Sequence, residues 1–481
     1  MSIRFGTDGW RAVISEEFTF SNVRLVSQAI ADMFRATQNG SQLLFVVGYD
    51  TRFLSDRYAK TVAGVLAANG IRVLLTERFA ATPAVSYAIV KHGAAGGVMI
   101  TASHNPPRYN GLKLKASYGG SASPEASRHV EEVLQENARR GRQPQQLSLD
   151  EGVRQGMITL FDPYDDYARH IRSLVDMDAI GRSGLPIAID AMYGAGIGFT
   201  DRILREAGIE PVTLHHEMNP GFGGLHPEPI GKHLQLLSET MAGSDLMLGL
   251  ATDGDADRIG AVGPDGVFID PHCIMALTLD YLIQKGQRGM VVKTVSTTQM
   301  LNLLGEEHGL DIVETPVGFN HISDLMLAND VLIGGEESGG ISIKGHIPEG
   351  DGVLMGLLLA ELVAKQGGDV TALLKQLMDR IGHFSYARHD YKTRPFSKSE
   401  LVKQLTVAAP DALAGIPVAE LNTRDGVKYL LQNGDWLLIR PSGTEPVLRV
   451  YAEAHTPEVV EQLLSDGGRL AEIAQKTMAA S

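Results

Sequence analysis

The sequence predicts an α/β protein made of three similar mixed α/β units and a smaller C-terminal α+β domain, arranged around a central cleft. Three observations lead to this fold class. Short apolar runs typical of buried strands alternate with stretches of helical spacing. This alternation occurs three times along the chain before the pattern changes, and the last strand of each repeat leads into an unusual polar loop. Because ligands of open α/β sheets bind beyond the carboxyl ends of the strands, three such loops can face one shared cleft.

The first unit shows the pattern most clearly. Strands are expected at 43–47, 71–75 and 97–101, with helices at 55–69 and 82–92 between them. Both helices begin at a Ser or Thr, residue types that cap helix N-termini well. The β-α-β-α-β order predicts a parallel sheet covered by helices.

The next two units repeat this order with little residue identity, and the C-terminal part departs from it. Strands are expected at 186–190, 210–214, 245–250, 289–293, 311–314 and 331–334, with helices near 197–207, 232–242, 297–308 and 319–328. The last part combines strands at 385–392 and 447–454 with helices near 397–407 and 457–480, which is typical of a smaller α+β domain.

The length of 481 residues corresponds to about three or four domains of ordinary size. We expect four: 1–155, 156–265, 266–380 and 381–481. Linkers are expected near 141–160, where Gln and Gly concentrate, and near 263–268 and 366–384.

The composition excludes several classes of protein. The chain is 44% apolar and 21% charged, as in an ordinary soluble protein, so disordered and fibrous classes are excluded. Its 43 basic and 57 acidic residues give a net charge of −14, which argues against a general nucleic-acid or anionic-membrane binder. A local cluster of Arg or Lys can still bind a small anionic substrate.

Cysteine usage and hydropathy indicate a cytoplasmic protein that does not enter a membrane. Cys273 is the only cysteine, so an intrachain disulfide and a Cys-rich zinc site are both impossible. The N-terminus MSIRFGTDGWRAV lacks a basic head followed by an apolar run, so we expect no secretory signal. The most apolar later stretch, Gly352–Ala364, is too short to cross a bilayer.

The loop after the third expected strand carries a candidate nucleophile. Ser103 is flanked by His104 and Asn105 and is followed by two prolines, which stiffen the chain. A serine hydroxyl needs activation, which His104, Lys113 or a metal ion could supply. A turn closed by prolines explains the same residues equally well.

The loop after the second unit's third strand predicts a metal site. Asp253, Asp255 and Asp257 alternate with small residues, so an extended loop places all three carboxylates on one side. Their mutual repulsion makes a hard cation such as Mg²⁺ the natural complement. The EF-hand pattern is excluded, because Arg258 and Pro264 stand where that loop needs Gly and Glu. We favour the metal site over a solvated acidic turn, because the loop directly follows a buried strand.

Three further loops carry weaker indications. Arg440, Ser442, Gly443 and Thr444 combine a guanidinium, two hydroxyls and open backbone N–H groups, which suits a phosphate but also an ordinary polar hairpin. Glu336 and Ser338 lie in a Gly-rich loop and could bind vicinal sugar hydroxyls. Arg11 lies in the Gly-rich N-terminal stretch and could reach a phosphate or pair with surface acids.

Taken together, these loops resemble those of the α-D-phosphohexomutase family, the phosphoglucomutases and phosphomannomutases. The matching stretches are FGTDGWR (5–11), TASHNPPRYNGLKL (101–114), DGDADR (253–258), GEESGG (335–340) and RPSGTEP (440–446). They follow the family's order and span nearly the whole chain. The resemblance implies four domains around a deep cleft and interconversion of hexose 1-phosphate and hexose 6-phosphate through a hexose 1,6-bisphosphate.

The resemblance also implies a role for each loop. Ser103 would carry the phosphoryl group and, with Asp253, Asp255 and Asp257, would hold Mg²⁺. Of the other residues, those implied in the transfer step are His104, Lys113 and Arg11, and those implied in substrate binding are Arg258, Glu336, Ser338, Arg440, Ser442, Gly443 and Thr444.

Two positions depart from the glucose-type pattern. Asn320 and Gly350 stand where such relatives often carry a basic residue, which puts the preferred sugar in doubt. The Glu-Glu-Ser-Gly-Gly form favours glucose over glucosamine. The leading hypothesis is a phosphoglucomutase that can also accept mannose phosphates. A phosphoglucosamine mutase and a hexose bisphosphate synthase are the alternatives within this chemistry, and a non-catalytic sugar-phosphate sensor is the alternative outside it. The sequence gives no oligomeric state.

Overall fold

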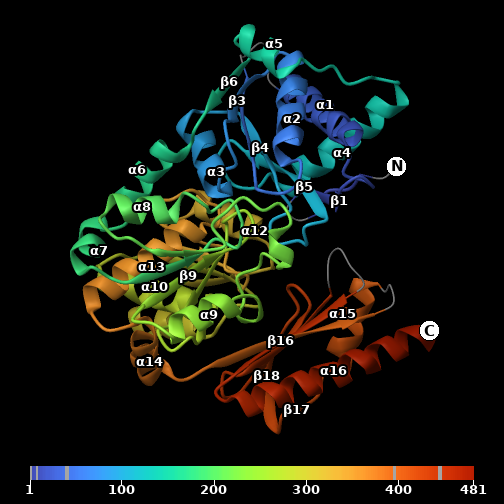
Figure 1. Ribbon diagram of the computed structural model, residues 1–481. Helices are drawn as coiled ribbons and strands as arrows, with labels where there is room; N and C mark the ends of the chain where they lie inside the picture. The colour runs from blue at the N-terminus through green and yellow to red at the C-terminus, as the bar shows by residue number, and fades with distance from the viewer. Residues whose placement is uncertain (1–2, 7–8, 38–42, 394–396, 442–446, 481) are drawn as a thin grey trace.

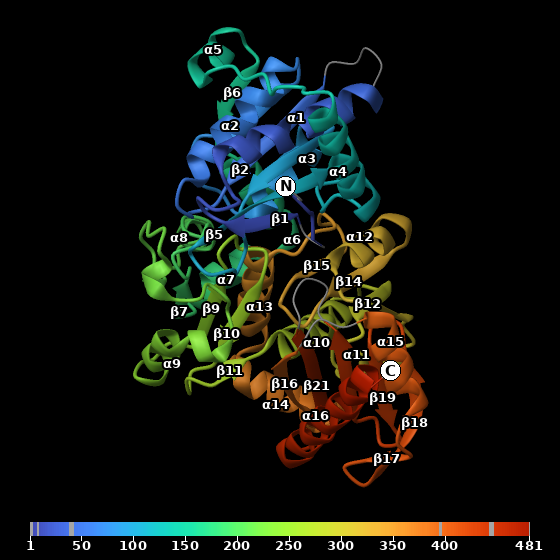
Figure 2. The ribbon, with the colours of Figure 1, turned by 90° about the vertical axis from the view of Figure 1, so that its right-hand side faces the viewer.

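The computed structural model describes residues 3–6, 9–37, 43–393, 397–441 and 447–480 (Figure 1). It contains three α/β sheets and a separate C-terminal sheet, as the sequence predicted. The first unit and the C-terminal domain lie at opposite ends of the molecule in Figures 1 and 2, with the second and third units between them. Within the described residues, no helix combines the length and the apolar character needed to cross a bilayer.

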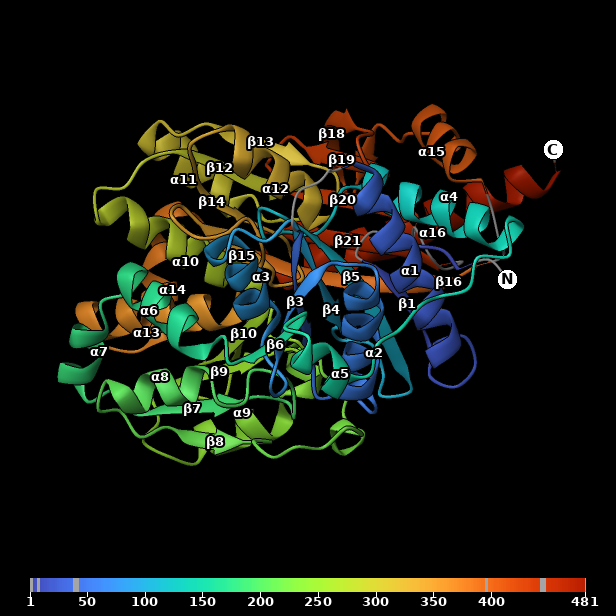
Figure 3. The same ribbon diagram turned by 90° about the horizontal axis from the view of Figure 1, so that it is seen from above.

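The first unit has helices on both faces of its sheet. Its elements are β1 (Trp10–Val13), α1 (Phe20–Thr37), β2 (Leu44–Tyr49), α2 (Ser55–Ala68), β3 (Arg72–Thr76), α3 (Thr82–Lys91), β4 (Gly96–Ile100), β5 (Tyr109–Ala116), α4 (Pro124–Arg139), α5 (Leu149–Arg154) and β6 (Ile158–Phe161). Helices α1 and α2 cover one face and α3 covers the other (Figure 3). Successive side chains of β2 point to opposite faces of the sheet. Phe45 packs on the side of α1 and α2, and Val46 packs on the side of α3.

The second and third units lie beside each other below the first (Figure 2). The second comprises α6 (Tyr164–Leu174), α7 (Met177–Ser183), β7 (Ile187–Asp190), α8 (Thr200–Glu206), β8 (Val212–Leu214), α9 (Gln235–Ala242), β9 (Leu248–Thr252), β10 (Ile259–Val262) and β11 (Phe268–Ile269). The third comprises α10 (Pro271–Gln284), β12 (Met290–Thr294), α11 (Met300–His308), β13 (Ile312–Thr315), α12 (Phe319–Ala328), β14 (Val331–Gly335), β15 (Ile341–Ile343), α13 (Gly352–Gln366) and α14 (Val370–Ile381).

The three units share one strand order, which confirms the predicted repeat. Their sheets contain the runs β5-β4-β2-β3, β10-β9-β7-β8 and β15-β14-β12-β13. In each run the last three strands are parallel, and the first strand is antiparallel to its neighbour. The polar loops that begin after β4, β9 and β14 therefore occupy equivalent places.

The C-terminal domain is an antiparallel sheet with helices packed on it. Its elements are β16 (Ser385–Lys392), α15 (Lys398–Val407), β17 (Ala412–Leu413), β18 (Ile416–Asn422), β19 (Val427–Leu431), β20 (Trp436–Pro441), β21 (Val447–Ala454) and α16 (Pro457–Ala480). The strand order is β16-β21-β20-β19-β18-β17, with every pair antiparallel. This agrees with the expected α+β domain.

Two strands lie beyond the expected domain boundaries, and one helix lies within a segment that was expected to be a linker. Strand β6 lies beyond 155 yet pairs with β3, because Ile158 is apolar and fills the edge of the first core. Strand β11 lies beyond 265 yet returns on β10 through a turn at Gly266. The segment 366–384, expected as a linker, contains helix α14, whose Leu373 and Leu377 are buried. As divisions of the chain, the four ranges stay a prediction.

The apolar core joins the first three units and leaves the C-terminal domain separate. One cluster contains Val85 of α3, Ile203 of α8 and Leu357 of α13, and so runs through all three units. The C-terminal domain has its own cluster between its sheet and helices α15 and α16. It meets the third unit through a small cluster in which Val295 packs with Trp436 and neighbouring side chains.

Candidate active site

Ser103 lies in the loop after β4 with its hydroxyl facing the second unit. Its side chain is fully buried, and its backbone has a positive φ of 50°, which L-residues rarely adopt. The backbone N–H donates to Thr101 Oγ1 at 2.8 Å. The hydroxyl donates to Asp253 Oδ2 at 2.8 Å, and its oxygen lies 3.3 Å from His104 Nδ1. The structure thus brings the candidate nucleophile against the candidate metal loop.

A buried arginine that the sequence analysis missed fixes this loop. The Arg52 guanidinium donates to the backbone oxygens of Ser103, Asn105, Pro106 and Tyr109. Its Nε lies 3.1 Å from Asp50 Oδ2, so the buried charge is paired. Planar donors spread over several carbonyls suit arginine and cannot be reproduced by lysine. The sequence offered one indication of this role: Arg52 follows β2 closely, at the same edge of the sheet as the Ser103 loop.

The Asp253 loop forms a compact carboxylate cluster. Asp253, Asp255 and Asp257 each offer an oxygen, and these atoms all lie within 4.8 Å of one another. Burial raises the pKa of the Asp253 carboxyl well above its usual range, and repulsion by Asp257 and Asp255 raises it further. Lys113 Nζ lies 3.0 Å from Asp255 Oδ2 and 2.9 Å from Asp257 Oδ2. Three hard oxygen donors fit a divalent cation, and the lysine offsets part of their charge.

Gly254 allows the two loops to approach each other. A Cβ atom at this position would lie 2.4 Å from the carbonyl oxygen of Ser103, closer than any side chain tolerates. The Gly254 N–H also donates to Pro227 O at 3.1 Å. The alternation of Asp with small residues is therefore a requirement of close backbone approach as well as of metal binding.

Positive groups surround the Ser103 hydroxyl. Burial lowers the pKa of His104 well below its usual value, and the nearby Arg258, Arg11 and other cationic groups lower it further, so the imidazole is neutral at pH 7. Arg11 Nη1 donates to Asn105 Oδ1 at 2.7 Å. Arg258 donates its backbone N–H to Asp253 Oδ1 at 3.3 Å. Guanidinium groups beside a hydroxyl and a carboxylate cluster suit a phosphoryl group.

The third polar loop meets the second one directly. The Ile259 N–H, next to Arg258, donates to Gly339 O at 3.1 Å. Glu336 and Ser338 lie half-buried in this loop, and Glu336 Oε1 accepts the Gly318 N–H at 2.8 Å. The structure therefore brings the loops of all three units together at one place.

The C-terminal domain contributes Arg440, held by an aspartate that the sequence analysis missed. Arg440 Nε donates to Asp425 Oδ2 at 2.7 Å, and the same oxygen accepts the Val317 N–H at 3.1 Å. Val317 precedes Gly318, so Asp425 joins Arg440 to the segment that Glu336 holds. Ser442, Gly443 and Thr444 lie outside the described residues.

The two positions that departed from the glucose-type pattern differ in structure. Gly350 lies against backbone, and a Cβ there would be 2.7 Å from Asp257 O and 2.9 Å from Gly340 Cα. A side chain at position 350 would therefore require the backbone of Asp257 or Gly340 to move. Asn320 is half-buried near the start of α12.

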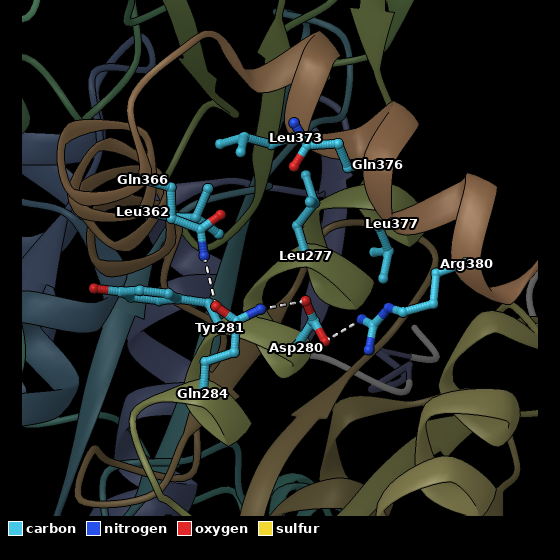
Figure 4. A pocket seen from close by; sticks show the side chains of 10 residues that line it. All are labelled: Leu277, Asp280, Tyr281, Gln284, Leu362, Gln366, Leu373, Gln376, Leu377 and Arg380. Carbon is cyan, nitrogen blue, oxygen red and sulfur yellow. Dashed lines mark hydrogen bonds and ion pairs between the residues drawn. The ribbon is translucent and has the colours of Figure 1, made fainter.

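A cavity elsewhere in the molecule is separate from this site. Its volume is about 250 Å³, and its lining comes from the C-terminal halves of α10 and α13 and from α14 (Figure 4). Asp280 and Arg380 pair across it. None of the lining residues belongs to the loops of Ser103, Asp253 or Glu336.

Known proteins share this architecture over nearly the whole chain. The chain matches the phosphoglucomutase/phosphomannomutase alpha/beta/alpha domains I, II and III over residues 2–140, 165–266 and 270–381, and the C-terminal domain over 399–466. Each of the first three matches contains one of the polar loops described above.

Individual relatives agree with these matches. A phosphoglucomutase/phosphomannomutase of Thermococcus kodakarensis is 29% identical over 98% of this chain and 99% of its own. A protein of Methanothermobacter thermautotrophicus described as a probable phosphoglucosamine mutase is 32% identical over 94% of each chain. A crystal structure from Thermus thermophilus, provisionally described as a phosphomannomutase, has a TM-score of 0.86 and 36% identity over 98% of this chain and 99% of its own. The chain belongs to the phosphoglucomutase/phosphomannomutase family of phosphohexomutases.

Proposed function

We propose that this phosphohexomutase interconverts hexose 1-phosphate and hexose 6-phosphate through a phosphorylated Ser103 and a hexose 1,6-bisphosphate, with glucose preferred and mannose accepted. One observation supports this most strongly. The buried Ser103 hydroxyl lies 2.8 Å from Asp253, a member of the carboxylate cluster. A hydroxyl held against a cation-binding cluster and flanked by guanidinium groups suits phosphoryl transfer, which needs positioning and charge neutralisation above all.

The carboxylate cluster would hold Mg²⁺ in the active enzyme. Asp253, Asp255 and Asp257 would be its protein ligands, joined by an oxygen of the phosphorylated serine. Bound there, Mg²⁺ supplies charge neutralisation at the transferring phosphoryl group. Lys113 keeps Asp255 and Asp257 in place through its two ion pairs.

The remaining loop residues orient the sugar phosphate. Arg11 and Arg258 lie beside the Ser103 loop, where they can bind the transferring phosphoryl oxygens, and the neutral His104 can accept or donate a proton at the reacting hydroxyl. Glu336 and Ser338 would bind sugar hydroxyls. Arg440, with Ser442, Gly443 and Thr444, would bind the phosphate that does not react. This division permits the bisphosphate to turn end for end and present its second phosphate to Ser103.

Relatives leave the preferred sugar open, because they include both a phosphoglucomutase/phosphomannomutase and a probable phosphoglucosamine mutase. The sequence Glu336-Glu337-Ser338-Gly339-Gly340 supports glucose over glucosamine. Phosphoglucosamine mutase is the second candidate, supported by the relative from Methanothermobacter thermautotrophicus. A cytoplasmic location agrees with hexose phosphates as substrates.

One assay tests the function. The purified enzyme is given glucose 1-phosphate, mannose 1-phosphate or glucosamine 1-phosphate with Mg²⁺, with and without the matching 1,6-bisphosphate, and the 6-phosphate product is measured. We expect turnover of glucose and mannose phosphates that the bisphosphate accelerates. Accumulation of bisphosphate as the final product would instead identify a bisphosphate synthase. Turnover of the glucosamine phosphate alone would exclude the proposed sugar preference.

A further inference from the structure

A second group of metal-binding side chains lies in the second unit, outside the carboxylate cluster. His226, Glu228 and His233 each offer a ligand atom, and these atoms all lie within 4.8 Å of one another. The segment connects β8 to α9 and contains Pro227 and Pro229, which restrict its backbone. Two imidazoles and a carboxylate form a donor set typical of zinc sites in proteins.

The separation of His226 and Glu228 fits an ion between them better than a hydrogen bond. His226 Nδ1 lies 3.7 Å from Glu228 Oε2, beyond hydrogen-bond range. Zinc bonds of about 2.0–2.2 Å to nitrogen and oxygen place two tetrahedral ligands roughly 3.4 Å apart. The Nδ1 atom is shielded from solvent and makes no hydrogen bond with any residue that the structure describes.

The backbone beside Glu228 fixes the tautomer of His233. Its Nδ1 lies 3.2 Å from the Glu228 backbone oxygen. A carbonyl oxygen only accepts, so Nδ1 must carry the proton and Nε2 holds the lone pair. Metal-binding histidines commonly donate their other ring N–H to a backbone carbonyl in this way, which fixes the tautomer and the ring orientation.

The surrounding backbone holds the segment in place. Pro227 O accepts the Gly254 N–H at 3.1 Å, and a Cβ at Gly260 of β10 would lie 2.3 Å from Pro229 O. The His226 ring centroid lies 6.1 Å from that of His104. The three side chains therefore lie on a packed segment that contacts both the metal loop and the nucleophile loop.

We propose that His226, Glu228 and His233 form a binding site for a divalent transition-metal ion such as Zn²⁺, distinct from the Mg²⁺ site of the carboxylate cluster. Imidazole ligands select zinc and related ions, whereas three carboxylates select Mg²⁺. The two sites are adjacent, because Gly254 of the carboxylate loop is hydrogen-bonded to Pro227. This proposal depends only on the geometry of the segment and stands apart from the proposed mutase reaction.

Zinc binding at excess Mg²⁺ tests the proposal. The full-length enzyme is saturated with Mg²⁺ to fill the carboxylate cluster, and Zn²⁺ is then titrated by calorimetry. We expect one bound zinc per chain. His233→Ala and His226→Ala should each weaken that binding about tenfold or more. Lys232→Ala, which removes an exposed positive charge beside His233, and Asp255→Asn, which alters the other cluster, should not weaken it.

A spectroscopic and a thermal measurement complete the test. Co²⁺ bound to nitrogen ligands at low coordination absorbs visible light strongly, so its spectrum should appear in wild type and Lys232→Ala and be lost in His233→Ala. Zn²⁺ should raise the unfolding temperature of the first two proteins only. Equal zinc binding by wild type and His233→Ala would overturn the proposal. Zinc binding that Mg²⁺ displaces, or that Asp255→Asn removes, would also overturn it, because the ion would then occupy the carboxylate cluster.

Discussion

The junction between the first three units differs in kind from the junction with the C-terminal domain. A continuous apolar core runs through the three units. The C-terminal domain meets the third unit through a small apolar cluster and a set of polar contacts centred on Glu314, which accepts from Asn422 at 2.7 Å and from Lys428 at 2.9 Å. Polar domain interfaces open at low cost, whereas a shared core does not.

This difference agrees with the two tasks of the proposed reaction. The Ser103 end needs fixed geometry and exclusion of water, and it is built where the core is continuous. The Arg440 end must release and rebind a phosphate while the bisphosphate turns, and it is built where the contacts are polar. The polar contacts of the C-terminal domain are compatible with such release and rebinding.

Ser103→Ala removes the proposed nucleophile from the part of the site that the continuous core supports. Mutase turnover should fall by more than about a thousand-fold, because a missing nucleophile cannot be replaced by positioning alone. Intact-mass and peptide mapping after incubation with glucose 1,6-bisphosphate should show a phosphate on Ser103 in wild type and none in the variant. The matched Ser121→Ala, on a serine outside the cluster, should keep both. Full turnover by Ser103→Ala would refute the mechanism.

Asp255→Asn removes one negative charge from the carboxylate cluster. Turnover should fall by at least about 100-fold, comparable to the loss of a well-placed electrostatic contact in other active sites. The Mg²⁺ concentration needed for half-maximal activity should rise, while circular dichroism stays unchanged. Asp265→Asn, in the turn between β10 and β11, is the control. An unaltered Mg²⁺ dependence in Asp255→Asn would show that the cation binds elsewhere.

Arg52→Lys tests how the Ser103 loop is held. A lysine cannot donate to four separate carbonyl oxygens, so several buried acceptors lose their partners, and the free energy of unfolding should fall by about 2–4 kcal/mol. Turnover should fall more than the affinity for Mg²⁺, because Arg52 positions Ser103 while the three carboxylates that hold the ion keep their places. Arg57→Lys, at an exposed position on α2, is the control. Turnover equal to that of wild type would indicate that the loop holds its shape without Arg52.

Arg440→Ala and Glu336→Gln separate the two proposed binding functions, which are binding of the non-reacting phosphate and binding of the sugar hydroxyls. Loss of a charged hydrogen bond costs about 1.5–3 kcal/mol, so Arg440→Ala should lower kcat/KM roughly 10–150-fold for glucose and mannose phosphates alike. Glu336→Gln should change the ratio between the two sugars. Asp425→Asn should act like a milder Arg440→Ala, mainly through KM, because it weakens the support of the guanidinium. If Arg440→Ala discriminates between the sugars and Glu336→Gln does not, the division of roles is wrong.

Lys293 is expected to affect stability and to have the smallest effect on turnover, and it reports on the polar junction. Burial, with the nearby Lys428, lowers the pKa of Lys293 to about 7. Between about pH 7 and the unfolded value near 10.5 the unfolded chain binds one more proton than the folded chain, so the free energy of unfolding should rise with pH by up to about 1.4 kcal/mol per unit. Lys293→Met should remove this rise in pH-dependent denaturation curves. Parallel curves for the two proteins would show that Lys293 does not titrate in this range.

Sequence reasoning predicted the fold well because the deciding features are local. Apolar runs, helix starts and the three polar loops at strand ends are visible in the chain. Packing of the first unit against the second then brings Ser103 and Asp253 together. It missed residues whose partners are distant in sequence. Arg52 and Asp425 look like ordinary surface charges until the carbonyls of the Ser103 loop and the guanidinium of Arg440 are placed around them.

Two of the predicted linkers were wrong for the same physical reason. Strand β6 and helix α14 were hidden in segments whose composition suggested linkers, because one strand or one amphipathic helix needs only a few apolar residues once a sheet or core exists to receive them. At Gly350 the consequence for the preferred sugar stays a prediction, and the structure adds that a Cβ there would lie 2.7 Å from the backbone oxygen of Asp257.

The hydrogen bonds of Arg52 also bear on the order in which the enzyme assembles. Its side chain bonds to Asp50 and to backbone oxygens between Ser103 and Tyr109, all within the first unit. Domains generally fold as units and in order as the chain leaves the ribosome. The nucleophile loop can therefore take its shape as soon as the first unit has been synthesised, and the later Asp253 loop docks onto a serine that is already in place.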